Sequence, residues 1–274
     1  MKGIITLIFQ LLIATIVFSG CIGTQPENIS YGQPDTSTNY GSIVETPVKY
    51  ASANDIEIGY REFGSGDPIV MIMPFAGTMD MVNDTFVSEL AGSYRVILFD
   101  NRGMGYSSNN NGTFSLSLFV NDTAGLMDEL DLPSAHIFGS SMGASIAQEL
   151  AVEHPEKVDT LILSSATYSL DISQTDVLKA KLQAISSDPE ANPVLQKYAK
   201  ANLEWNGTYE QLPDIQNKVL LLTGTEDLLT PVDISLEMVE MIPDAQLVRF
   251  DGVGHCGEQD LGAEYADRIL VFLS

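Results

Sequence analysis

The sequence is short of basic residues, of cysteine and of histidine, and each shortage narrows what the protein can be. Its 274 residues include 13 Lys and Arg against 37 Asp and Glu, for a formal net charge of −24. We expect no nucleic-acid partner, because phosphate binding needs a basic surface. An acidic surface of this kind is typical of exported or salt-adapted proteins, with a preference for neutral or cationic ligands as the alternative.

Other kinds of site are missing as well. The two cysteines, Cys21 and Cys256, are too few for a disulfide framework. No cluster of histidines and carboxylates has metal-ligand spacing, and no glycine-rich loop is of the phosphate-binding type. We therefore expect neither a metal nor a cofactor. The 45% of hydrophobic residues is enough for a full core, in one large domain or two small ones.

The first 20 residues predict an export signal. Lys2 precedes a mostly apolar run, and two small residues then lead to Cys21. The Ser-Gly-Cys ending resembles a prokaryotic lipobox, although Phe18 stands where Leu, Val or Ile is usual. We expect an exported protein with a signal peptide at 1–20, anchored to the outer face of the cell membrane by lipid on Cys21. An uncleaved anchor helix and a plain secretory signal are the alternatives, and both also place the domain outside the cytoplasm.

The next segment, 21–44, is rich in Thr, Ser, Gln, Asn and Pro and has no hydrophobic periodicity, which predicts a flexible tether. Five Asn-x-Ser/Thr sequons predict glycosylation in addition. They begin at Asn28, Asn83, Asn111, Asn121 and Asn206.

Strand-like and helix-like segments alternate over 45–274, where we place the folded domain. Apolar runs typical of fully buried strands occur at 69–73, 96–99, 161–163 and 219–222, and an alternating pair at 47–53 and 56–62. Helix-period segments lie between the apolar runs or after them, at 116–130, 144–153, 235–241 and 263–273. This alternation predicts an α/β fold with a mostly parallel, doubly wound sheet flanked by helices.

One stretch, about 168–212, separates two predicted strands by more than one helix requires. Within it, 176–185 and 194–203 have helical patterns, with two prolines between them. We interpret the stretch as a small helical cap over the sheet, or else as a long surface excursion. Insertions of this length usually carry function, so we expect substrate specificity to depend on it.

Residues 139–143, Gly-Ser-Ser-Met-Gly, form a G-x-S-x-G motif between a predicted strand at 135–138 and a predicted helix. On such a sharp turn the two glycines allow close backbone approach, and the N-terminus of the helix favours developing negative charge. Ser141 is therefore the candidate nucleophile of a hydrolase.

A serine hydroxyl is a weak nucleophile, so it needs a base within hydrogen-bond reach and a carboxylate that orients the base. Among the three histidines, His255 lies in a glycine-rich loop after a predicted strand and is the candidate base. His136, at the start of a strand, and His154, at a helix end, are expected to be structural or solvated.

The acid is expected between the serine and the histidine in chain order. Asp227 directly follows the predicted strand at 219–222 and is the candidate, with Glu226 and Asp171 as alternatives. Asp227 or Glu226 would otherwise only cap the helix that begins near Pro231.

Two backbone N–H groups are needed to bind the oxyanion. Met142, which follows the nucleophile, supplies the first candidate. The second is expected in the loop after the strand at 69–73. Pro74 has no N–H, so Phe75 is the candidate and Ala76 the alternative.

Together these motifs resemble the α/β-hydrolase superfamily over residues 45–274. The resemblance rests on the serine turn, on Gly-Thr-Glu-Asp at 224–227, on Gly-Val-Gly-His at 252–255, and on Phe-Asp-Asn-Arg-Gly-Met-Gly-Tyr-Ser at 99–107. It implies an eight-stranded-type sheet with a small helical cap. It also implies that Asp100 and Arg102 brace the loops around the site rather than react.

The resemblance further implies hydrolysis of a small-molecule acyl substrate, most often a carboxylic ester, through an acyl-enzyme. C–C bond hydrolysis, amide hydrolysis and perhydrolysis are alternatives, as is a non-catalytic surface binding protein on the same scaffold. Met73-Pro74 stands where relatives commonly have His-Gly, which predicts a differently shaped oxyanion loop. The sequence does not indicate an oligomeric state.

The roles of five further side chains depend on the fold. Met79, Met81, Phe75 and Trp205 are candidates either for an apolar acyl pocket or for the core. Cys256 follows the candidate base directly but has no basic neighbour in sequence, so we expect a buried structural thiol rather than a reactive one.

Overall fold

The computed structural model describes residues 42–274. The predicted signal peptide, the lipidation of Cys21, the sequon at Asn28 and nearly all of the predicted tether lie outside the described residues, and they stay predictions. Within 42–274, no helix is both long enough and apolar enough to cross a membrane.

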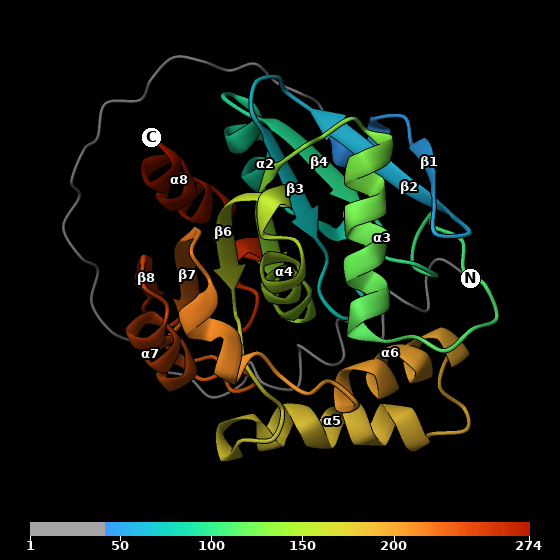
Figure 1. Ribbon diagram of the computed structural model, residues 1–274, viewed down its shortest axis with the longest axis vertical. Coiled ribbons are helices and arrows are strands. Elements are labelled where there is room, and N and C mark those ends of the chain that lie inside the picture. The colour runs from blue at the N-terminus through green and yellow to red at the C-terminus, as the bar shows by residue number, and fades with distance from the viewer. Residues whose placement is uncertain (1–41) are drawn as a thin grey trace, which may run out of the picture. The chain divides into compact units, whose positions relative to one another are not determined.

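An eight-stranded sheet forms the centre of the domain (Figure 1). Its strands are β1 (Lys49–Ala53), β2 (Ile56–Phe63), β3 (Pro68–Ile72), β4 (Arg95–Phe99), β5 (Ala135–Ser140), β6 (Val158–Ser164), β7 (Lys218–Gly224) and β8 (Ala245–Phe250). Their spatial order is β1-β2-β4-β3-β5-β6-β7-β8. β2 is antiparallel to both neighbours, and every other neighbouring pair is parallel. The predicted fold class, a mostly parallel α/β sheet, is confirmed.

Helices flank this sheet (Figure 1). α2 (Asp84–Ala91) packs against α8 (Gly262–Leu273), and α3 (Leu116–Glu129) packs against α4 (Met142–Glu153). α7 (Val232–Met241) packs on β7 and β8. Phe86 of α2 and Ile269 of α8 join Met71 and Leu98 of the sheet in one buried core. The sequence analysis did not predict α2, although its buried residues Phe86, Val87, Leu90 and Ala91 repeat with a helical spacing.

Asn83, the first residue of a predicted sequon, is the N-cap of α2. Its side-chain oxygen accepts from the N–H of Phe86 at 3.1 Å, and its amide nitrogen donates to the carbonyl of Gln259 at 2.9 Å. A glycan on that nitrogen would disturb the second bond, so this sequon is poorly placed for modification. The asparagines of three other sequons are exposed, at Asn111, Asn121 and Asn206.

The long connection between β6 and β7 contains α5 (Asp176–Ser187) and α6 (Pro193–Leu203), which pack against each other. Both helices lie beyond the carboxyl ends of the strands (Figure 1). On α6, Tyr198 is fully buried and its hydroxyl donates to the carbonyl of Arg102 at 2.9 Å. The insertion therefore contains the two helices that the sequence predicts, and α6 anchors it to the domain.

Candidate active site

Ser141 occupies a turn that depends on its glycine neighbours. Its backbone has φ 53° and ψ −117°, a strained conformation for a residue with a side chain. A Cβ on Gly139 would lie 2.3 Å from the carbonyl oxygen of Gly143, and a Cβ on Gly143 would lie 2.2 Å from that of Ile72. Both positions thus require glycine, and the turn presents Ser141 between the end of β5 and the start of α4.

The structure brings Ser141, His255 and Asp227 together. The Nε2 atom of His255 lies 2.8 Å from Oγ of Ser141, and its Nδ1 atom lies 2.7 Å from Oδ2 of Asp227. The three residues follow β5, β8 and β7, whose carboxyl ends meet at one edge of the parallel sheet. A carboxylate only accepts hydrogen bonds, so Nδ1 carries the proton and Nε2 is free to accept one from the serine.

The alternatives for base and acid lie elsewhere. His136 has its Nδ1 atom 2.6 Å from Oγ1 of Thr160, and His154 stands at the end of α4. Glu226 and Asp171 are exposed, so neither takes the place of the acid.

Asp227 is buried and surrounded by hydrogen-bond donors. The N–H groups of Leu229 and Thr230 donate to its Oδ1 at 2.8 and 2.9 Å, and the Thr230 hydroxyl lies 2.8 Å from its Oδ2. Burial disfavours the carboxylate, but His255 and these bonds outweigh burial and lower the pKa of Asp227. The carboxylate is therefore held ionised. Thr230, which the sequence analysis did not identify, belongs to the site for this reason.

His255 sits between opposing influences. Burial of the ring disfavours the imidazolium, but Cys256 and the Asp227 carboxylate favour it and raise the pKa of His255 above its ordinary value of 6.5. Asp227 acts through direct contact with the Nδ1 atom of the ring. The ring is thus well suited to hold a proton taken from Ser141.

A buried carboxylate that the sequence analysis missed lies among the loops of the site. Glu258 is 1% exposed, and it accepts hydrogen bonds from the hydroxyls of Ser140 and, at 2.7 Å, of Ser164. The carbonyl of Ser164 accepts in turn from the N–H of Ser141 at 2.9 Å. Glu258 therefore ties the loop of His255 to the strands β5 and β6. The sequence shows an acidic residue three positions after His255, but no local pattern indicates that its side chain faces inward.

Cys256 is buried, and its N–H donates to Oγ of Ser165 at 2.9 Å. Its sulfur lies 3.4 Å from Oγ of Ser140. The thiol is therefore part of the packing between the loop of His255 and the strands, which agrees with a structural role.

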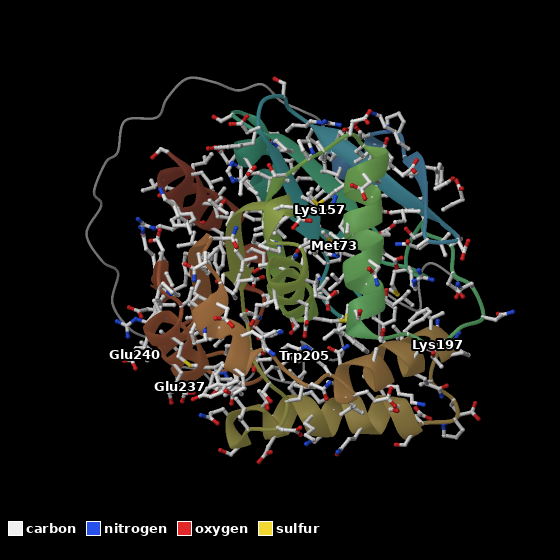
Figure 2. All side chains as sticks on the ribbon, viewed as in Figure 1. Met73, Lys157, Lys197, Trp205, Glu237 and Glu240 are labelled. Carbon is white, nitrogen blue, oxygen red and sulfur yellow. The ribbon has the colours of Figure 1, made fainter. Side chains whose placement is uncertain are left out.

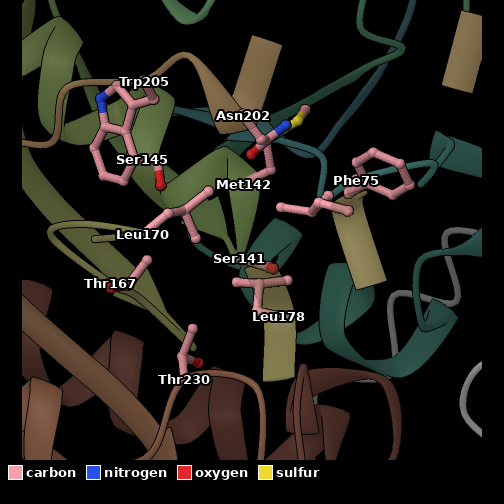
Figure 3. A pocket seen from close by; sticks show the side chains of 11 residues that line it. Phe75, Ser141, Met142, Ser145, Thr167, Leu170, Leu178, Asn202, Trp205 and Thr230 are labelled. Atoms are coloured by element: carbon pink, nitrogen blue, oxygen red, sulfur yellow. The ribbon is translucent and has the colours of Figure 1, made fainter. Parts of the chain in front are cut away.

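The two residues predicted to bind the oxyanion, Phe75 and Met142, line the same cavity as Ser141 (Figure 3). Met142 is the first residue of α4, so its N–H has no acceptor within the helix. Ala76, the alternative to Phe75, is not among the described residues that line the cavity. A hydrogen bond from the N–H of Gly77 to the carbonyl of Pro74, 2.9 Å long, closes the turn of this loop.

Asp100 and Arg102 brace the neighbouring loops. Asp100 accepts from the N–H groups of Met79 and Tyr106, each at 2.7 Å, and burial raises the pKa of Asp100 to about 6. Arg102 forms a buried ion pair with Asp122. These contacts are of the kind that the resemblance implies.

The cavity beside Ser141 is narrow and uncharged. Its volume is about 20 Å³, room for about one water molecule. Its walls include Leu170, Leu178, Leu182 and Trp205 of the insertion, and none of the described residues that line it carries a charge.

The structure also shows which of the four apolar candidates line the cavity and which belong to the core. Phe75 and Trp205 line the cavity, whereas Met79 is fully buried in the core and Met81 is not among the described lining residues. Among residues 42–274, no group of three or more His, Cys, Asp or Glu side chains is placed to hold a metal ion.

Comparisons with known proteins agree with this fold. A family model described as alpha/beta hydrolase fold matches residues 67–192. The chain is 28% identical to a putative non-heme bromoperoxidase of Mycobacterium tuberculosis, covering 74% of this chain and 92% of that protein. It is also 28% identical to a 2-hydroxymuconate semialdehyde hydrolase of a Pseudomonas species, in an alignment that covers 81% of this chain and 92% of that protein.

Solved structures show the same fold. A thermophilic esterase from Thermogutta terrifontis aligns with a TM-score of 0.71 at 20% identity, over 83% of this chain and 98% of the esterase. An α/β hydrolase from a Medee basin deep-sea metagenome library aligns with a TM-score of 0.74 at 18% identity, over 82% of this chain and 97% of that hydrolase. Its sheet order, its serine turn and these matches together show that the chain has the α/β-hydrolase fold.

Proposed function

We propose that the protein is a serine hydrolase that cleaves carboxylic esters outside the cytoplasm. The observation that carries the proposal is the continuous contact from Oγ of Ser141 through His255 to Asp227, at 2.8 and 2.7 Å. This arrangement supplies a proton acceptor to a hydroxyl that is otherwise a weak nucleophile.

In the proposed reaction, Oγ of Ser141 attacks the acyl carbonyl carbon while Nε2 of His255 takes its proton. The carbonyl oxygen becomes an oxyanion, which the N–H groups of Phe75 and Met142 bind. The intermediate then expels the alcohol, which receives the proton from His255. A water molecule, deprotonated by His255, attacks the acyl-enzyme in the same way, and the carboxylic acid leaves with Ser141 restored.

The uncharged cavity favours esters over the acidic substrates of some relatives. One relative, 24% identical, is a 2-hydroxy-6-oxononadienedioate hydrolase from a Pseudomonas species, and its name denotes a substrate with two carboxylates. None of the described residues that line the cavity is Lys or Arg. Burying an unpaired carboxylate there would be costly, so a neutral acyl group is the better fit.

A fluorophosphonate probe tests this proposal on the full-length protein. We expect covalent labelling of the wild type, no labelling of Ser141→Ala, and at least a hundredfold slower labelling of His255→Ala. His154→Ala is the matched control and is expected to label like the wild type. A folded wild-type protein that never labels would instead favour a non-catalytic binding protein.

The proposed location rests on the N-terminal sequence. Lys2, the apolar run and Cys21 support export and lipid anchoring at the outer face of the membrane. Cys21→Ala is expected to move the protein from the membrane fraction to the soluble extracytoplasmic fraction. Unchanged membrane association would contradict anchoring through this residue.

A further inference from the structure

Trp205 forms a wall of the cavity beside Ser141 (Figure 3). It follows α6 closely and is 8% exposed. Figure 2 shows it between α4 and the pair of α5 and α6. Its Nε1–H donates to Oε1 of Glu149 at 2.6 Å. The indole ring is therefore fixed by a direct bond and not by packing alone.

Glu149 belongs to α4, the helix that begins immediately after the nucleophile. Ser141, Ser145 and Glu149 are spaced four residues apart, so they lie along one side of the helix. Ser145 lines the cavity as well. The rise from Ser141 to Glu149 is about 12 Å, at about 1.5 Å per residue. One side of α4 thus leads from the nucleophile to the group that holds the indole.

The indole also screens the cavity from charge. Glu149 is half-buried and is not among the described residues that line the cavity. The indole ring of Trp205, which is hydrogen-bonded to Glu149, does line it. Leu170 and Leu182, both buried, complete an apolar surface on this side.

We propose that Trp205, held by Glu149, is the end wall of the acyl pocket and restricts the substrate to esters of short, uncharged acyl groups. This inference rests on the proposed ester hydrolysis. An acyl chain that extends from Ser141 along this side of α4 meets the indole, so a long chain fits there only if the ring is removed or displaced.

The test compares kcat/KM for p-nitrophenyl acetate, butyrate and octanoate, with Ser141→Ala as the blank. The wild type is expected to prefer acetate. Trp205→Leu is expected to raise the ratio of octanoate to acetate hydrolysis by roughly tenfold or more, since a pocket discriminates a single methylene by about 10- to 200-fold. Trp205→Phe keeps more of the bulk, so its ratio is expected between those of the wild type and the leucine variant.

Variants of Glu149 test whether its hydrogen bond to Trp205 positions the indole. Glu149→Ala removes the acceptor, so the ratio is expected to shift toward octanoate. Glu149→Gln keeps an acceptor and is expected to retain the preference for acetate. Glu153→Gln, one turn further along α4, is the control for loss of a charge. Trp205 is the only tryptophan in the chain, so its fluorescence reports on the ring directly. A changed emission is expected in Glu149→Ala and wild-type emission in Glu153→Gln.

Two different failures are distinguishable. If the wild type cleaves acetate and Trp205→Leu keeps the wild-type ratio, the pocket assignment is wrong while ester hydrolysis stands. If Trp205→Leu does not fold, Glu149→Ala supplies the test. The pocket assignment is then wrong if Glu149→Ala has the same ratio of octanoate to acetate hydrolysis and the same Trp205 fluorescence as the wild type. If the wild type cleaves no ester and takes up no fluorophosphonate, the proposed function itself fails.

Discussion

Buried polar contacts hold the loops that carry Ser141, Asp227 and His255, whereas α5 of the insertion packs against α6 and is otherwise largely exposed. Asp227 is 3% exposed and receives bonds from two backbone N–H groups. In α5 the buried residue is Leu182, and Val177 on the same helix is 49% exposed.

This difference separates chemistry from selectivity. At the sheet edge, moving one group leaves another buried polar group without its partner, which is costly. On α5 a side chain can change with little effect on the fold, because much of the helix faces solvent. We therefore expect substitutions at the sheet edge to lower kcat and substitutions on α5 to change KM.

The largest effect is expected from Asp227→Asn. Loss of the carboxylate leaves the imidazole without its orienting partner, and kcat is expected to fall about 10⁴-fold. Catalysis needs a neutral His255, whose pKa is lowered by burial but raised above 6.5 by Cys256 and the Asp227 carboxylate together. The acidic limb of the kcat/KM profile is therefore expected above pH 6.5 in the wild type and at lower pH in the variant.

A pH profile of residual activity checks this prediction, with Glu226→Gln as the control. Glu226 is adjacent in sequence but exposed, so its removal is expected to leave the profile unchanged. An acidic limb that stays in place in Asp227→Asn would show that another group sets the pKa of the base.

A smaller effect is expected at Glu258, which ties the His255 loop to the strands. Glu258→Ala is expected to lower kcat roughly 10²-fold with little change in KM, because a small displacement of reacting groups has a cost of that order. Glu258→Gln keeps an acceptor and is expected to recover part of the loss.

Steady-state kinetics and thermal unfolding together distinguish positioning from simple stability. Glu264→Ala, an exposed substitution on α8, is the control and is expected to match the wild type. If Glu258→Ala lowers the melting temperature but leaves kcat unchanged, the carboxylate is structural and does not position the triad.

The smallest effect is expected on α5. Leu178 lines the cavity, and its neighbour Val177 is exposed. Leu178→Ala is expected to raise KM for a short ester roughly fivefold, since it removes about 1 kcal/mol of apolar contact. Val177→Ala is the matched control and is expected to leave KM unchanged. Equal KM values in the two variants would mean that α5 does not contact the substrate.

Local patterns in the sequence predict the alternation of strands and helices and the sharp turn at Ser141. Both depend on local causes, namely buried apolar runs and the absence of a Cβ on Gly139 and Gly143. The sequence also orders the candidates Ser141, Asp227 and His255 along the chain, because each follows a strand of a parallel sheet. The spacing of Phe86, Val87, Leu90 and Ala91 was a local signal for α2 as well, although α2 was not predicted.

Which side chains face one another depends on the packing of distant segments. Glu226 and Asp227 are adjacent and chemically alike, yet only Asp227 turns inward to His255. Glu258 and Trp205 acquire their places from contacts with Ser164 and Glu149, which are distant in the chain. Such pairings depend on how strands and loops pack in space, and no local pattern of residues encodes that packing.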